Sequence, residues 1–253
     1  SLVLSLDTLI VKSTVSPAKM TGYYTGAVNL GKIPYYLVSA FCTIILPVVA
    51  KKTGQHDLDG AVKQVKDFIQ IIVIAVLPIP VIISASSTVV LSVFYKPEYG
   101  QAGNTLSCLA FSNFFMGMTV LFNMVLTAFA SNKFSDALSI GSLIIVVPVF
   151  IMSAKYGGIV WIAIASATCT FLTMLISYLA LYRKTGNLLY RSTLISMVLN
   201  GLLWVITRAL FSTLEVTNLF MLAAAYVLLY VCFICALLIL KIFKIPKNNC
   251  TKN

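Results

Sequence analysis

The sequence predicts an all-α protein, a polytopic membrane helix bundle with about eight transmembrane helices. Hydrophobic residues make up 60% of the 253 positions, and the mean hydropathy is +0.98. Charged residues make up only 10%, against about 25% in a soluble domain. The apolar positions form runs of about 20 residues, which is the length that an α-helix needs to cross a bilayer.

Eight apolar segments follow one another along the chain. The third contains Pro78 and Pro80, which should kink it, with neighbouring groups satisfying the freed carbonyls. A polar loop is expected at 51–67, a short loop at 96–104, and a turn at Gly157-Gly158. The segments lie at about 1–15, 25–50, 68–95, 105–130, 137–152, 159–182, 192–211 and 218–240.

We expect one transmembrane domain over residues 1–253, closed by a basic cytosolic tail at 241–253. No basic stretch and cleavage site of a secretory signal are found at the start. Ser1 opens inside an apolar run without an initiator Met. The chain is therefore expected to be a fragment whose N-terminal part is missing.

The loop charges predict the orientation of the helices. When loops are assigned alternately to two sides, one side receives twelve basic residues and the other receives four, Lys12, Lys19, Lys96 and Lys155. The richer side is predicted to be the cytosol, and with it the C-terminus of a multi-pass plasma membrane protein. The net charge of +11 is explained in this way, without nucleic acid as a partner. The twelve are Lys51, Lys52, Lys63, Lys66, Lys133, Arg183, Lys184, Arg191, Lys241, Lys244, Lys247 and Lys252.

A polar stripe runs along the second segment. Its members recur every three or four residues, so they share one face of a helix. Such a face, with a lysine in it, is kept in a membrane mostly where it meets a protein interior or a water-filled cavity. The pattern therefore indicates a path for a polar substrate. The stripe consists of Thr25, Asn29, Lys32, Tyr36, Ser39 and Thr43.

The first segment repeats this pattern with Ser1, Ser5, Thr8 and Lys12, and Asp7 lies beside that face. Both segments are predicted to line a central aqueous cavity. The alternative is that Asp7 pairs with Lys12 or Lys32 and fixes the packing of the helices.

The other polar residues within the segments have simpler explanations. Arg208 is expected to reach the outer interface, or else to contact an anion within the protein. Asn113 and Asn123 are expected to form interhelical hydrogen bonds. Close helix contact is predicted for the stripe of Ser166, Thr170, Thr173 and Ser177, and the eighth segment is expected to face lipid.

The sequence carries no pattern of an enzyme, a metal centre or a cofactor site. It contains no Walker A sequence, no Ser-His-Asp set and no metal-ligand cluster, and its loops are too short for a soluble catalytic domain. Cys232 and Cys235 have the C-x-x-C spacing but lie in an apolar run, so they are interpreted as buried hydrophobic residues. No catalytic residue, metal or cofactor is predicted.

Short motifs lie between residues 7 and 184. They are Asp7 within a span, Gly22-Tyr23-Tyr24, Ala27 to Pro34, Leu46-Pro47 before a basic loop, and Tyr95-Lys96-Pro97-Glu98-Tyr99 followed by Ala102 and Leu106. In these motifs and their spacing the chain resembles the C-terminal half of polysaccharide and lipid-linked oligosaccharide flippases, in the multidrug/oligosaccharidyl-lipid/polysaccharide exporter superfamily. The motif that begins at Tyr95 resembles that family's outer loop.

The resemblance implies a two-lobe transporter that works by alternating access, with this chain as the C-terminal lobe and an N-terminal lobe missing. The implied substrate is a saccharide on a lipid carrier with a phosphate head, moved from the cytosolic to the outer leaflet. Lys12, Lys32 and Arg208 would then face the phosphate, and Asp7 would balance charge or couple an ion. Asn29, Tyr36, Tyr23 and Tyr24 would meet the sugar.

Two other functions are considered. A drug or small-metabolite antiporter of the same superfamily would be coupled to a cation and would tend to have an acidic cavity, whereas the two stripes carry two lysines and one aspartate. A membrane polymerase or ligase of sugar chains usually has a large outer loop, and every outer loop expected here is short.

Overall fold

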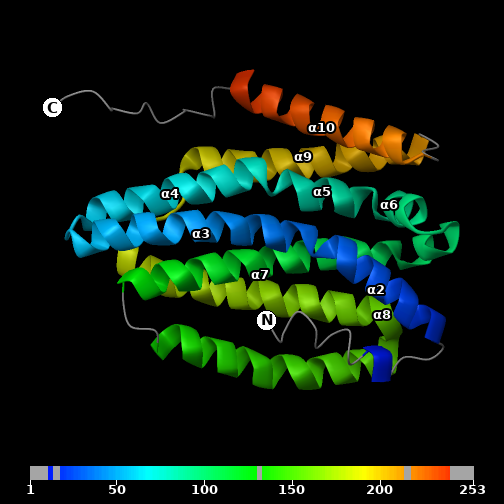
Figure 1. Cartoon of the computed structure of the whole chain (residues 1–253), viewed down its shortest axis with the longest axis horizontal. Helices are drawn as coiled ribbons and strands as arrows, with labels where there is room; N and C mark the ends of the chain where they lie inside the picture. Colours follow the sequence, from blue (N-terminus) through cyan, green and yellow to red (C-terminus); the bar gives the residue numbers. More distant parts are fainter. Residues whose placement is uncertain (1–10, 14–17, 130–132, 214–217, 240–253) are drawn as a thin grey trace.

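The computed structural model describes residues 11–13, 18–129, 133–213 and 218–239. Their regular structure is helical throughout, without strands, which confirms the predicted all-α fold. Among the described residues, six helical stretches are long and apolar enough to cross a membrane. The helices run roughly side by side in a bundle (Figure 1). The described chain is thus a multi-pass membrane helix bundle.

The helices follow the predicted segments in order. The second segment corresponds to α2 and α3, the third to α4, α5 and α6, and the fourth to α7. Both the fifth and the sixth lie in α8, which bends at Gly158, where φ is +67°. Most of the first segment, with Asp7, lies outside the described residues. The bounds are α2 (Ala18–Gly31), α3 (Ile33–Gly54), α4 (Leu58–Ala75), α5 (Pro78–Ala85), α6 (Ser87–Phe94), the 3-10 helix η1 (Pro97–Ala102), α7 (Gly103–Phe129), α8 (Lys133–Thr185), α9 (Arg191–Thr213) and α10 (Leu219–Ile239).

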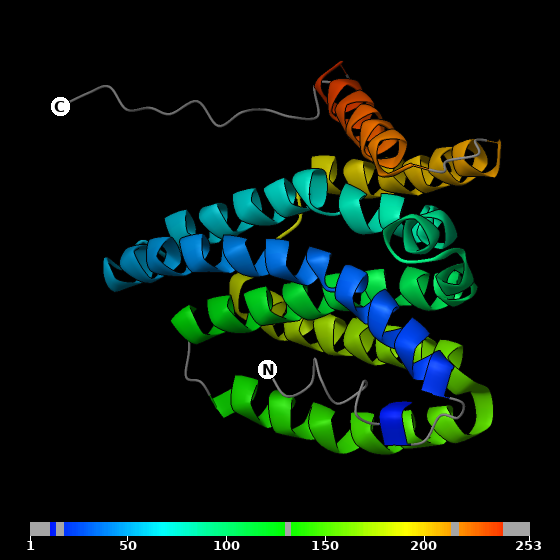
Figure 2. The same ribbon diagram turned by 45° about the vertical axis from the view of Figure 1, so that its right-hand side comes forward.

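The fifth predicted segment lies in the first part of α8, where the apolar helical stretch Ile144–Ser153 is described. This part of α8 lies along one side of the bundle, next to the second part of the same helix (Figure 2).

The predicted polar loop at 51–67 is wrong, because α3 and α4 extend into it and leave only residues 55–57 between them. Asp57 caps α4 by accepting a hydrogen bond from Gly60 N at 2.9 Å, and it also pairs with Lys52 at 3.2 Å. These contacts hold the pKa of the Asp57 carboxyl below its usual range, the backbone hydrogen bond being the larger cause. Hydropathy marks where a membrane span ends, and polar residues continue the helix beyond that point.

The third span is broken at its prolines, as predicted. Helix α4 ends at Ala75 and α5 begins at Pro78. At this break Ile79 N donates to Val76 O at 3.0 Å, three residues back, rather than to Ala75 O. Tyr230 of α10 donates its hydroxyl to that Ala75 carbonyl at 3.1 Å. A distant side chain thereby satisfies a backbone group that the break leaves free.

Helix α10 is mostly exposed and apolar, as expected of a lipid-facing span, but it also contributes two polar contacts that the sequence did not predict. Tyr226 lies one turn from Tyr230 and forms a hydrogen bond with Ser86, at the second break of the third span between α5 and α6. Much of the remaining α10 surface is exposed, including Phe220 and Val227. Two tyrosines in an apolar helix are easily taken for lipid-facing residues, which is why the sequence did not reveal them.

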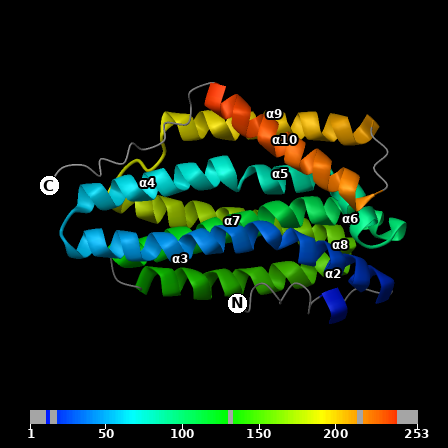
Figure 3. The ribbon, with the colours of Figure 1, turned by 45° about the horizontal axis from the view of Figure 1, so that its top comes forward.

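Helix α7 lies in the centre of the bundle. It contacts α2, α3, α5, α6 and α8, while α9 packs on α4 and α5 at the far side (Figure 3). Gly117 allows α7 to approach α3 closely, because a Cβ there would lie 2.8 Å from the Cβ of Val38 on α3. The small residue at this position sets how near the two spans can come.

Basic residues gather at one end of the bundle. The end that carries the α3–α4 connection, the start of α8 and the start of α9 lies on the left of Figure 1. Lys19 and Lys96 belong to the opposite end, with the start of α2 and with η1. The described residues at the basic end include Lys51, Lys52, Lys63, Lys66, Arg183, Lys184 and Arg191.

We expect Tyr230→Phe to lower the stability of the bundle by about 1 kcal/mol, because it leaves the Ala75 carbonyl without its partner. The measurement is thermal unfolding of the purified chain in detergent. Tyr182→Phe is the matched control, since Tyr182 is an exposed tyrosine of α8. Equal unfolding temperatures for the two variants would contradict this role of Tyr230.

Candidate functional site

The predicted polar stripe lies on a face of α2 and α3 that other described helices leave uncovered. Asn29, Tyr36 and Thr43 are exposed, Tyr36 by 60%, and the remaining members are half-buried. The opposite face of α3 packs into the core through Val38, Cys42, Ile45 and Val49. The helical face inferred from the spacing of the stripe is therefore the one that points away from the core.

Lys32 lies in the middle of this stripe, where α2 ends and α3 begins. Pro34 follows two residues later and has no N–H for the Leu30 carbonyl one turn before it, which weakens the helix at this point. A Cβ on Gly31 would lie 3.1 Å from Leu109 Cβ, so the junction rests closely on α7. The lysine is thus held within the Lys19–Gly54 span, a little over a third of the way from Lys19 to Gly54.

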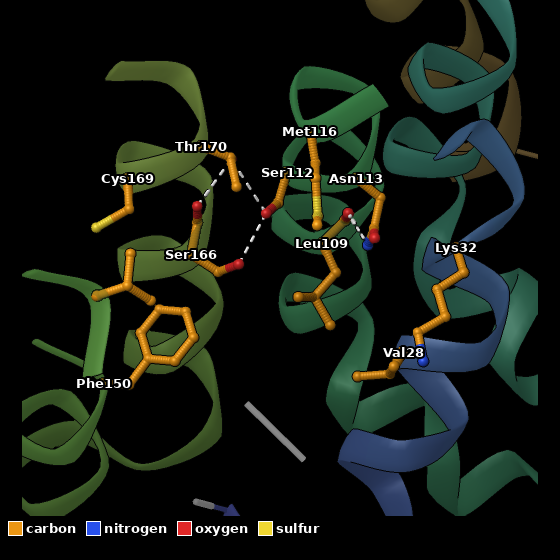
Figure 4. A pocket seen from close by; sticks show the side chains of 11 residues that line it. Val28, Lys32, Leu109, Ser112, Asn113, Met116, Phe150, Ser166, Cys169 and Thr170 are labelled. Carbon is orange, nitrogen blue, oxygen red and sulfur yellow. Dashed lines mark hydrogen bonds between the residues drawn. The ribbon is translucent and has the colours of Figure 1, made fainter. Parts of the chain in front are cut away.

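Lys32 borders a small cavity between the α2–α3 junction, α7 and both parts of α8 (Figure 4). The cavity has a volume of about 30 Å³, which is room for one or two water molecules and not for a sugar ring. Its polar lining comes from Ser112 and Asn113 on α7 and from Ser166 and Thr170 on α8, and Val28, Met116 and Phe150 are among its apolar walls.

The hydroxyl groups in this cavity bind to one another. Thr170 donates to the Ser166 carbonyl at 2.8 Å, so its oxygen accepts from Ser112 at 3.2 Å. Ser112 in turn accepts from Ser166, with 2.7 Å between the two oxygens. All three hydroxyl protons are then engaged within the protein. This network joins α7 to α8, and it confirms the close helix contact predicted for Ser166 and Thr170.

Lys32 is the charged group of this cavity. Its amine forms no hydrogen bond or ion pair with the residues that the structure describes, and none of the described lining residues is acidic. The Asn113 amide nitrogen donates to Leu109 O of its own helix at 2.9 Å. The arrangement therefore offers a cation at the border of a narrow hydrated space, suited to an anionic group that approaches along the uncovered face.

The other candidate residues lie apart from Lys32. Tyr24 is fully buried in the core, and Tyr23 is 8% exposed and donates to Glu98 Oε2 at 3.4 Å. Arg208 is exposed on α9, which packs on α4 and α5 rather than on α2 or α3. Lys12 is exposed within the short helical stretch 11–13, and Asp7 lies outside the described residues. The structure thus brings Asn29, Lys32 and Tyr36 together on one face and leaves Arg208 elsewhere.

Two further predictions need correction. The Nδ2 hydrogen bond of Asn113 stays within α7, and Asn123 Oδ1 is buried without a partner among the described residues. The interhelical bonds expected of these asparagines are therefore not the ones observed. Cys232 and Cys235 are exposed rather than buried, because α10 lies at the edge of the bundle.

Sequence reasoning missed a polar contact at the basic end of the bundle. Tyr190, just before α9, donates to Asp67 Oδ1 on α4 at 3.0 Å, and Gln70 Nε2 donates to Ser192 Oγ at 3.1 Å. Burial, followed by the Asp67 hydrogen bond, raises the pKa of the Tyr190 hydroxyl to about 12. Each of the two hydrogen bonds joins residues more than 120 positions apart, so no local sequence pattern predicts them.

We expect Ser112→Ala to lower stability by about 1 kcal/mol, since it removes the hydroxyl that links α7 to α8. Thr119→Ala is the control, because the Thr119 hydroxyl bonds only to Phe115 O of its own helix. Thermal unfolding in detergent compares the two. If Ser112→Ala lowers the stability no more than Thr119→Ala does, the hydrogen bonds between α7 and α8 contribute nothing to stability.

The chain was compared with protein-family models, with curated proteins and with solved structures, and none of the three comparisons gives a match. The functional interpretation therefore rests on the residues and geometry described above.

Proposed function

We propose that this chain is one lobe of a membrane transporter that moves a lipid-linked oligosaccharide or polysaccharide precursor across the bilayer by alternating access. The observation that carries the proposal is the uncovered polar face of α2 and α3, with Lys32 at its centre. The resemblance of the sequence motifs to flippases of lipid-linked saccharides supports the same function.

The physical argument concerns the surroundings of that face. A lysine near the middle of a membrane span is expensive in contact with lipid, so it meets protein or water. The described helices of this chain leave its face uncovered. A second lobe across a hydrated cavity would satisfy this requirement, and rocking of two lobes around the cavity would expose it to each side of the membrane in turn.

The chemistry of the face favours an anionic substrate head. Lys32 is unpaired among the described residues, so its charge is available to a phosphate or diphosphate, and the pairing offsets the desolvation of both groups. Asn29 and Tyr36, both exposed beside it, provide hydrogen-bonding groups for sugar hydroxyls. A cation-coupled antiporter would be expected to have a carboxylate at this position, because a carboxylate attracts a cation and the lysine ammonium repels it.

The orientation follows from charge. The end of the bundle that carries Lys51, Lys52 and Arg183 is proposed to face the cytosol, and the end with Lys19 and Lys96 the outside. We place the protein in the plasma membrane, where it would take its substrate from the cytosolic leaflet, with the C-terminus on the cytosolic side. Membrane lipids and a second lobe are its proposed partners.

We expect Lys32→Ala to slow transport at least tenfold, because a charge-assisted contact with the substrate head contributes about 1.5–3 kcal/mol. Transport is measured with the complete transporter in proteoliposomes, as the appearance of a labelled polyprenyl-diphosphate oligosaccharide in the opposite leaflet. Lys32→Arg should retain most of the rate because it keeps the charge.

Lys63→Ala is the matched control, since Lys63 is an exposed lysine of α4 near the basic end. Its rate should equal that of the unchanged protein. A Lys32→Ala variant that is normally folded and transports at the full rate would refute the role of Lys32. Absence of movement of any such substrate by the unchanged transporter would refute the function itself.

A further inference from the structure

A second pocket lies at the end of the bundle opposite the basic cluster, where the start of α2 meets the connection from α6 to η1. Its volume is about 380 Å³, within the range of small-ligand pockets. It lies outside the cavity beside Lys32 and shares no lining residue with it. Its side chains are Lys19, Tyr23, Tyr95, Lys96, Glu98 and Tyr99.

The tyrosines of this pocket form a fixed stack. Tyr99 packs face to face with Tyr95, with 4.9 Å between ring centroids and 17° between ring planes. The edge of Tyr23 meets Tyr99 at the same centroid distance. Gly26 admits the stack against α2, because a Cβ there would lie 3.1 Å from Tyr99 ring carbons. Tyr99 is thereby held between its neighbours, and Tyr95, which is 40% exposed, is the outermost ring.

This arrangement is a platform and not a cage. A cage for a quaternary ammonium group needs several rings facing one centre. Here the rings pack on one another, and Tyr95 leaves its outer side to the solvent. The negative face of an aromatic ring attracts the polarised C–H groups of a sugar ring that lies flat on it.

Charged groups surround the platform. Glu98 is exposed and accepts a hydrogen bond from Tyr23, which leaves acceptor positions on its carboxylate for sugar hydroxyls. Lys19 and Lys96 are exposed and form no ion pair with a described residue. An aromatic face, a carboxylate acceptor and two ammonium donors around one pocket match the C–H faces, hydroxyls and acidic substituents of a saccharide.

We propose that this pocket binds a saccharide, whose ring stacks on Tyr95 while Glu98 accepts its hydroxyls and Lys19 or Lys96 donates to its oxygens. The binding stands on the pocket alone. Its role, holding the sugar chain on the outer side after transport, rests on the proposed function. Interfacial tyrosines and lysines that merely anchor a membrane span would show no such binding.

The test is a glycan array with neutral and acidic glycans, probed with the labelled chain in phospholipid nanodiscs. We expect glycans to be retained, with affinity reduced at least tenfold by Tyr95→Ala and by Glu98→Gln. Tyr95→Phe should bind nearly as well, since the stacking face remains. Tyr182→Ala, at an exposed tyrosine of α8, should bind normally.

Retention no higher than that of lipid-only nanodiscs would overturn the proposal, as would binding that neither variant weakens. Glu98→Gln changes a surface group by one atom, so it decides the matter if Tyr95→Ala fails to fold. The array measures binding without transport. Glycan binding together with normal transport by the Lys32→Ala variant would therefore support this pocket and refute the role of Lys32. Slow transport by Lys32→Ala without any glycan binding would support the role of Lys32 and overturn the proposal for this pocket.

Discussion

A polar group inside a membrane bundle is costly unless it finds a partner in the protein or in water, because the surrounding hydrocarbon offers none. This constraint accounts for the contacts that join the helices of this bundle at its breaks and at its central cavity. The break before Pro78 is compensated by Tyr230, and the hydroxyls of Ser112, Ser166 and Thr170 bind one another across two helices. Where the described protein provides no partner, as for the amine of Lys32, the same constraint points to something outside it.

The central position of α7 connects these features. Its contacts with α2 and α8 bring Lys32 and the hydroxyl network to one cavity, and its close approach to α3 at Gly117 directs the opposite side of α3 outward. The core therefore determines which face of α2 and α3 remains uncovered. The uncovered face around Lys32 adjoins the end of α2, and the pocket at Tyr95 adjoins its start.

The sequence predicted much of this fold, because membrane spans are marked by composition and length. The helical face that carries Asn29, Lys32 and Tyr36 also followed from spacing, since a helix repeats regularly. The errors have a common physical origin. The loop at 51–67 was wrong because hydropathy reports the membrane and not the helix, and Tyr226 and Tyr230 were missed because their partners lie about 140 and 155 residues away. Pairings of this kind depend on tertiary packing, which no local pattern encodes.

The pocket at the opposite end shows the same limit. Tyr95, Glu98 and Tyr99 lie close together in the sequence, but only packing against α2 adds Lys19 and Tyr23 to them. Gly22 and Gly26, one turn apart on α2, are the local signal of a close approach there. They do not identify which rings approach.

The most direct test of the central claim is the access of water to the uncovered face within a membrane. Single cysteines at Asn29, Tyr36 and Thr43, in the complete protein with its native cysteines replaced, would be treated with a membrane-impermeant thiol reagent. Val198 and Val205, exposed on the apolar surface of α9, are the controls. The account predicts modification at the three polar positions and none at the two controls. Protection at all five positions would contradict it, because the stripe would then be buried against protein or lipid and not along a hydrated path.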